Sequence, residues 1–72
     1  MTDDEFKEKL GDKVHNLRKD KDLTLYQLAN LTQAHKTTIM RIEKAEVSPS
    51  ANLLRRISMA LDVPLEELVK LE

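Results

Sequence analysis

The hydrophobic residues of this chain recur with helical spacing, and no segment shows the alternation expected of a β-strand. In the first segment the spacings are four, four and three, at Phe6, Leu10, Val14 and Leu17. This pattern predicts one apolar face of a helix that runs to about Lys21. Thr2, followed three residues later by Glu5, has the form of a capping box and predicts where this helix begins.

Gly11 lies inside the first helical pattern and is the only glycine of the chain. A glycine in a helix interior costs roughly 1 kcal/mol relative to alanine. We therefore expect the turns that precede Gly11 to be frayed or to form a separate segment.

Two short helices and a connecting turn are predicted between residues 24 and 44. Thr24 and Gln27 form a second capping box, which starts a helix over about 25–31. The turn covers 32–35, and the next helix runs over about 36–44.

The apolar residues of these two helices have the spacing of a shared buried seam. Leu28 and Ala29 belong to the first helix, and Ile39 and Ile42 to the second. Ala29 is small enough for two helices to cross closely. The other face of the second helix stays exposed and is largely cationic and hydroxyl-bearing. It is formed by Lys36, Thr37, Met40, Arg41 and Lys44. A short, rigid helix with such a face can enter a groove of DNA.

The last third of the chain predicts two more helices. Ser50 is the expected N-cap of the fourth helix, and Pro64 suits the first turn of the fifth. The residues expected to face the core are Leu54, Ile57 and Leu61, with Leu53 and Ala60 beside them, then Leu65, Leu68 and Val69. Leu71 and Met59 exceed what a small core needs, so they are either ordinary exposed residues or part of a dimer interface.

Length and composition limit the classes of protein and of binding site that this chain can form. Seventy-two residues suffice for one domain, which we assign to residues 1–72. There is no cysteine and no apolar run long enough to span a bilayer, which together suggest a cytoplasmic protein. The only aromatic residues are Phe6 and Tyr26, so base stacking on an aromatic platform is not expected.

The charges are unevenly distributed along the chain. Residues 13–56 carry nine cations and four anions, a net charge of +5, whereas the remaining residues carry three cations and nine anions. Electrostatic fields decay over about 8–10 Å at physiological salt. A local basic face can therefore attract phosphates although the whole chain has a net charge of −1. A solvated surface of mixed charge is the alternative.

Catalytic and metal-binding arrangements are not evident. His15 and His35 are twenty residues apart and have no cysteine or carboxylate cluster at ligand spacing. Ser48 and Ser50 lack a base and an orienting acid in a recognisable arrangement. We therefore expect no enzyme activity, no metal and no cofactor.

The chain resembles the XRE family of helix-turn-helix domains, which includes the Cro and CI phage repressors. The matching residues follow in order from about Leu10 to Val69: Leu17-Arg18, Thr24, Gln27-Leu28-Ala29, Thr38-Ile39, Arg41-Ile42-Glu43-Lys44, Pro49-Ser50, Leu54, Ile57, Ala60-Leu61, Val63 and Leu65-Glu66-Glu67-Leu68. The resemblance implies an all-α, five-helix, lambda-repressor-like DNA-binding domain. Its helix-turn-helix would span about 24–44, with helix 36–44 in the major groove.

The resemblance also implies roles for individual residues. By position, the base-contacting residues are Lys36, Thr37, Met40 and Arg41. The phosphate-contacting residues are Thr24, Tyr26, His35, Thr38, Lys44 and Ser48. Arg18 and Glu43 fall where the family often has a partly buried ion pair that ties the first helix to the third; two independent surface charges are the alternative.

Several positions depart from the family pattern. Asp22, Gln33, Ala45 and Asp62 stand where the family commonly has glycine, at sites that often need a left-handed backbone. His35 stands where serine or threonine usually caps the recognition helix, so we expect that cap to be weaker or to come from another residue. Leu25 replaces a residue that is often polar, and with Met40 it makes the DNA-facing surface more apolar.

We expect a transcriptional regulator, such as a repressor, that binds a double-stranded DNA operator as a homodimer in a prokaryotic or phage setting. The alternative is a protein-interaction module or an antitoxin on the same fold. Its partner would bind Leu25, Tyr26 and Met40 or the C-terminal helix.

Overall fold

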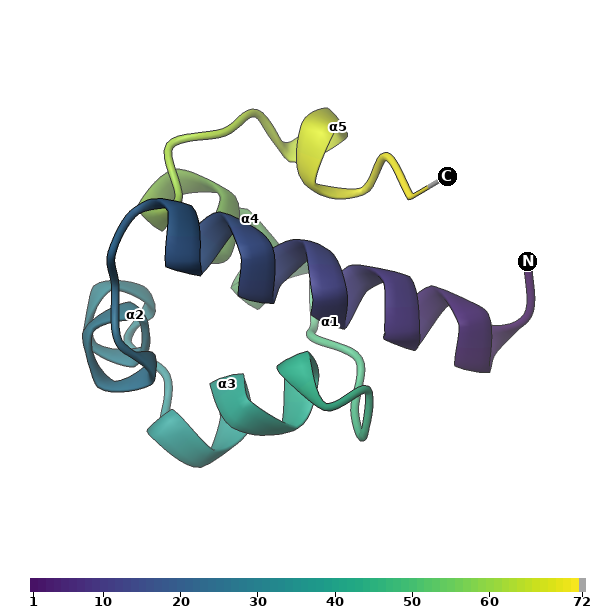
Figure 1. The fold of residues 1–72 in the computed structure, drawn as a ribbon, viewed down its shortest axis with the longest axis horizontal. Helices are drawn as coiled ribbons and strands as arrows, with labels where there is room; N and C mark the ends of the chain where they lie inside the picture. The colour runs from purple at the N-terminus through teal and green to yellow at the C-terminus, as the bar shows by residue number, and fades with distance from the viewer. Residues whose placement is uncertain (72) are drawn as a thin grey trace.

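The computed structural model describes residues 1–71, which form helices joined by short turns (Figure 1). The helices of the described chain are α1 (Asp3–Asp20), α2 (Leu25–Thr32), α3 (Lys36–Glu43), α4 (Ala51–Ala60) and α5 (Leu65–Leu68). No strand is present within residues 1–71. The expected all-α, five-helix fold is confirmed.

Helix α1 is held at its start by the predicted capping box. The Thr2 hydroxyl accepts a hydrogen bond from the Glu5 amide at 3.1 Å, and the Glu5 carboxylate accepts one from the Thr2 amide at 3.1 Å. These bonds to Thr2 also lower the pKa of Glu5 below its ordinary value. Two of the amide groups that a helix start leaves unpaired are thereby satisfied.

The expected fraying before Gly11 is wrong, because α1 is continuous from Asp3 to Asp20. Gly11 is buried against the end of α3. A Cβ atom at this position would lie 2.6 Å from the carbonyl oxygen of Ile42 and 2.8 Å from that of Glu43. Glycine is therefore required for the close packing of two helices, and this requirement outweighs its low helix propensity.

The core lies between the helices, and α1 to α5 all contribute buried apolar side chains to it. In Figure 1, α1 runs between α3 on one side and α5 on the other, and it packs against both. The predicted seam is confirmed, since Leu28, Ala29, Ile39 and Ile42 are all at most 3% exposed. The other buried apolar side chains are Leu10, Val14, Leu53, Ile57, Leu61, Leu68 and Leu71.

The predicted core residues at the C-terminal end need correction. Leu68 is fully buried, but Leu65 and Val69 are about two-fifths exposed, at 41% and 38%. Leu71, expected to be surplus, is buried instead. Helix α5 ends after four residues, so the following chain does not continue its helical face. Helical spacing extended past Leu68 therefore predicted the wrong burial for Val69. Met59 is exposed, as expected.

Four of the helices end with the same backbone geometry. Asp22, Gln33, Ala45 and Asp62 have φ angles of 57°, 57°, 63° and 57°. This confirms the left-handed backbone that the resemblance implies at four positions where the family commonly has glycine. After each of these residues an amide donates back across five residues, as in the bond from Glu46 to the Arg41 carbonyl at 2.9 Å. This arrangement satisfies carbonyl groups that a helix end would leave unpaired.

Among residues 1–71, no helix has the length and apolar character that a membrane-spanning segment needs.

Candidate nucleic-acid interface

Helices α2 and α3 form the predicted pair of short helices with a turn between them. The capping box of α2 is present, with the Gln27 amide donating to the Thr24 hydroxyl at 3.0 Å. Gln33 ends α2 in the left-handed conformation and turns the chain into α3. Ile39 and Ile42 fix α3 from its inner side, at 0% and 1% exposure. The opposite side of α3 is consequently held rigidly toward solvent.

The outer surface of α3 carries the residues predicted to contact bases. Lys36, Thr37 and Arg41 are exposed, and Met40 is half-buried. Helical spacing places Lys36, Thr37, Met40 and Arg41 along one side of α3. The surface offers cationic donors, a hydroxyl group and a thioether at the positions that sequence reasoning selected.

The residues predicted to contact phosphates surround this surface. Tyr26 is 65% exposed on the first turn of α2, and Lys44 and Ser48 are exposed after α3. Thr38 is half-buried. The Thr24 hydroxyl already accepts from Gln27, so its remaining capacity is to donate its own hydrogen.

The N-terminus of α3 lacks a side-chain cap, as expected for His35. His35 has an extended backbone and makes no capping hydrogen bond. The first amide groups of α3 therefore retain their donor capacity, and the helix dipole adds partial positive charge there. The amide groups at this helix start can donate hydrogen bonds to a phosphate oxygen.

The predicted ion pair between Arg18 and Glu43 is confirmed, and it joins α1 to the end of α3. Arg18 Nε lies 2.7 Å from Glu43 Oε2, and Arg18 Nη2 donates to Glu43 Oε1 at 3.0 Å. Both side chains are more than nine-tenths buried. Arg18 Nη1 also donates to the Leu23 carbonyl at 2.8 Å, so the guanidinium spans α1, the following turn and α3.

Sequence reasoning missed a third member of this cluster, His15. Its Nδ1 lies 2.8 Å from Glu43 Oε1, although the ring remains half exposed. The sequence pattern indicated no role for His15 beyond the metal site that its spacing argued against. The available signal was its position three residues before Arg18, on the same side of α1.

The cluster keeps Glu43 ionised. Burial acts to raise the pKa of its carboxyl, but the hydrogen bonds donated by Arg18 and His15 outweigh burial and hold that pKa below its ordinary value. The bond with Glu43 in turn raises the pKa of Arg18. Both charges therefore persist at neutral pH, and the end of α3 stays fastened to α1.

The described residues contain no group of three or more His, Cys, Asp or Glu side chains placed to bind a metal.

The model of the HTH_3 helix-turn-helix family matches residues 14–68, which include the ion pair, α2 and α3. The chain belongs to the HTH_3 family. The XRE-type resemblance is thereby confirmed. No curated protein matches the sequence.

Three solved structures have a similar arrangement of helices over most of this chain. An HTH_3 family transcriptional regulator from Vibrio cholerae is 33% identical, with a TM-score of 0.87 over 93% of this chain. The restriction-modification controller protein C.AhdI from Aeromonas hydrophila is 26% identical, with a TM-score of 0.84 over 86% of this chain and 94% of its own. The clp gene regulator ClgR from Corynebacterium glutamicum is 25% identical, with a TM-score of 0.85 over 89% of this chain and 68% of its own.

This HTH_3 chain spans 38% of the length of the Vibrio cholerae regulator.

Proposed function

We propose that this HTH_3 domain is a sequence-specific transcriptional regulator that inserts α3 into the major groove of double-stranded DNA. Membership of the family assigns the chain to DNA-binding transcription regulation, a non-enzymatic kind of function. The observation that carries the proposal is the placement of α3. Ile39 and Ile42 bury its inner side, the Arg18–Glu43 pair fastens its end, and a cationic side faces solvent.

The proposed base contacts come from Lys36, Thr37, Met40 and Arg41. Lys36 and Arg41 donate to guanine O6 and N7, and Arg41 can use two donors at once. Thr37 and Met40 offer apolar contact to a thymine methyl group. These contacts supply the choice of sequence, because base edges in the major groove differ between the four base pairs.

The proposed phosphate contacts supply affinity and fix the position of the domain on the duplex. They come from the uncapped start of α3 and from six residues on or next to α2 and α3: Thr24, Tyr26, His35, Thr38, Lys44 and Ser48.

A homodimer belongs to the same proposal, because one short recognition helix contacts only a few base pairs. Two copies would bind half-sites about 34 Å apart. Leu65, the first residue of α5, and Val69, which directly follows its last residue, are both partly exposed and offer apolar surface for the contact between copies. The buried Leu71 is not available for it. We place this dimer in the cytoplasm of a prokaryotic cell, in keeping with its bacterial relatives.

The test is selection of bound duplexes from a random pool at two salt concentrations, followed by two alanine variants. Arg41→Ala should relax the preference at one base position and cost about 1–3 kcal/mol of binding free energy on the selected sequence. Lys44→Ala should weaken binding to all sequences alike and reduce the salt slope by about 0.9. Fluorescence anisotropy on matched and shuffled duplexes measures both effects.

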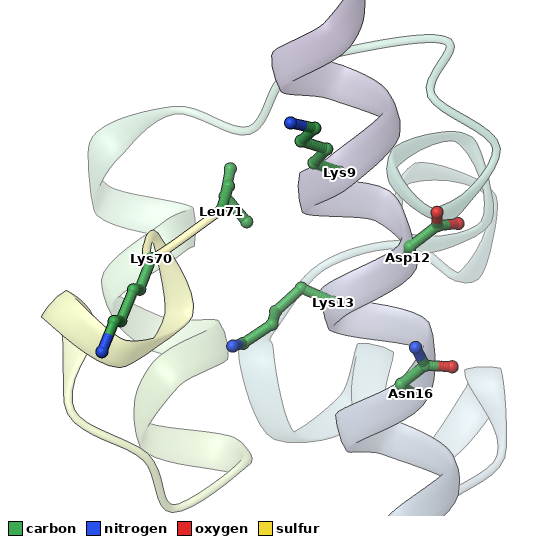
Figure 2. A pocket seen from close by; sticks show the side chains of 6 residues that line it. All are labelled: Lys9, Asp12, Lys13, Asn16, Lys70 and Leu71. Atoms are coloured by element: carbon green, nitrogen blue, oxygen red, sulfur yellow. The ribbon is translucent and has the colours of Figure 1, made fainter.

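Lys9→Ala is the control for the loss of one positive charge, since Lys9 lies on α1 beside the C-terminal residues (Figure 2) and not on α2 or α3. An equal loss on every sequence for Arg41→Ala would remove Arg41 from the base-contacting set. Failure of the wild-type chain to select any duplex at low salt would contradict the proposed function.

The second candidate function is a protein-interaction module on the same fold. Tyr26 and Leu31 on α2 are 65% and 57% exposed. Exposed side chains with this much apolar surface are better suited to contact with a protein than with a DNA phosphate. Leu25 and Met40, the other residues expected on such a face, are half-buried and offer less surface. An interaction module predicts negligible DNA affinity even at low salt, where electrostatic binding is strongest.

A further inference from the structure

Glu46 is an acidic residue beside an otherwise basic surface. Between Leu23 and Leu61 the chain has two acidic residues, Glu43 and Glu46. Glu43 is buried and bound to Arg18 and His15, whereas the Glu46 side chain is 54% exposed. An exposed carboxylate at a phosphate-binding surface repels the ligand and lowers affinity. Its position therefore calls for a role that offsets this cost.

Glu46 is paired with Arg41, the strongest candidate for a base contact. The distance between Glu46 Oε1 and Arg41 Nε is 3.9 Å, and the Arg41 side chain is 57% exposed. This distance allows an ion pair but exceeds that of a hydrogen bond. Arg41 is consequently attracted toward Glu46 while the end of its side chain stays accessible.

The backbone fixes Glu46 at this place. Ala45 has a φ of 63°, which turns the chain back at the end of α3. The Glu46 amide then donates to the Arg41 carbonyl at 2.9 Å. The pairing of the two side chains thus follows from how α3 ends.

The geometry of the pair suits the contact that Arg41 would make with a guanine. Glu46 lies next to Nε, which leaves the two terminal nitrogens, Nη1 and Nη2, to donate together to O6 and N7. A carboxylate beside Nε also opposes the capture of Arg41 by a DNA phosphate, because the phosphate must compete with an anion already in place.

We propose that Glu46 is a positioning residue that sets the specificity of Arg41. It orients the guanidinium for a guanine contact and weakens the contact of Arg41 with phosphates in non-specific complexes. This inference rests on the proposed function, because it presumes that α3 enters the major groove.

The first experiment compares Glu46→Gln with the wild-type chain on the selected operator and on a shuffled duplex of equal length, over a series of salt concentrations. The variant should bind the shuffled duplex about threefold more tightly, which is in the range of one exposed ion pair. Its salt slope on that duplex should steepen by about 0.9, as expected for one additional phosphate contact. The ratio of specific to non-specific affinity should fall.

Glu66→Gln removes the same charge on α5 and is the matched control, with less than about twofold change expected. Circular dichroism of both variants should show wild-type unfolding temperatures, since both side chains are exposed.

The second experiment repeats Glu46→Gln in an Arg41→Ala background, on the shuffled duplex at low salt. If Glu46 acts through Arg41, its effect on affinity and salt slope should vanish there. An undiminished effect would show that Glu46 acts as a general negative charge, and would overturn the inference.

The two proposals fail in different ways. If the wild-type chain selects an operator but Glu46→Gln leaves the affinity ratio unchanged, only the inference about Glu46 is wrong. If the wild-type chain selects no operator at low salt, both proposals fall.

Discussion

At the scale of single residues, the one glycine of the chain lies at a close contact between two helices. The four positions with a left-handed backbone carry other residues. Gly11 sits against the carbonyl groups of Ile42 and Glu43 at the end of α3. The left-handed positions carry Asp22, Gln33, Ala45 and Asp62. Steric contact between elements determines the first choice, whereas the turns tolerate a modest backbone cost.

Gly11→Ala should lower the free energy of unfolding by about 2 kcal/mol, because the added Cβ would meet backbone atoms that cannot move independently of α3. Urea denaturation measures the change. Asn16→Ala, at an exposed position of α1, is the control and should leave stability equal or slightly higher. A stabilised Gly11→Ala variant would mean that α1 and α3 can separate at no cost.

Ala45→Gly should raise the free energy of unfolding by about 1 kcal/mol, since glycine adopts a φ of 63° without the Cβ contacts that strain alanine. Thermal unfolding followed by circular dichroism measures the effect. Ala51→Gly, at the start of α4, should instead destabilise, because its backbone is helical. The prediction fails if both substitutions shift the midpoint in the same direction.

At the scale of elements, α3 depends on α1 as much as on its partner α2. The contact combines the close approach at Gly11 with the buried Arg18–Glu43 pair and the added hydrogen bond from His15. Removing one member of a buried pair leaves an uncompensated charge. The orientation of the proposed recognition helix should therefore be sensitive to substitutions that lie behind it, away from DNA.

Glu43→Gln should lower the free energy of unfolding at neutral pH by about 3 kcal/mol, because Arg18 would remain buried without a counter-ion. Chemical denaturation against pH measures a second consequence. The pKa of Glu43 is lower in the folded than in the unfolded chain. Its contribution is thus complete above the ordinary glutamate pKa and is lost as pH falls through the lower folded value.

The Glu43→Gln variant should consequently lose less stability between neutral pH and acid than the wild-type chain. Some loss should remain, because the pKa of Glu5 is also lowered by its bonds to Thr2. Asn16→Ala, which removes no ionisable group, is the control and should follow the wild-type pH profile. An unchanged pH dependence in Glu43→Gln would show that the carboxylate is not held by Arg18 and His15 in solution.

At the scale of the whole molecule, positive and negative charges are concentrated in different segments of the chain. Residues 13–56 hold the excess of cations, whereas the acidic start of α1 and the acidic α5 belong to the chain ends. The two ends of the described chain, residues 1 and 71, lie at the same end of the molecule (Figure 1). A hollow lies between α1 and the C-terminal residues, and its lining includes Lys9, Lys13 and Lys70 (Figure 2). The Lys13 ammonium is paired with the Glu67 carboxylate at 3.3 Å.

Val69→Glu should weaken the proposed dimer at least about tenfold, because it would place a charge on a partly exposed apolar position directly after α5. Sedimentation equilibrium over a range of concentrations measures the association. Leu31→Glu on α2, which is also exposed, is the control and should leave association unchanged. A wild-type chain that is monomeric at all concentrations, and on an operator with two half-sites, would contradict the dimer.

The sequence by itself determined the features that depend on residues a few positions apart. The helices, the capping boxes at Thr2 and Thr24 and the seam of Ile39 with Leu28 follow from local spacing. The Arg18–Glu43 pair and the left-handed turns followed from the resemblance to a family.

Only the tertiary structure decided the features that depend on distant residues. Position 11 requires glycine because α3 packs closely against it. His15 contacts the carboxylate of Glu43, which is 28 positions away in the sequence. Leu71 is buried in the core although it lies beyond the end of α5. Helical periodicity describes which side of one element is apolar. It does not contain the distance between two elements, and that distance sets steric limits, hydrogen-bond partners and burial.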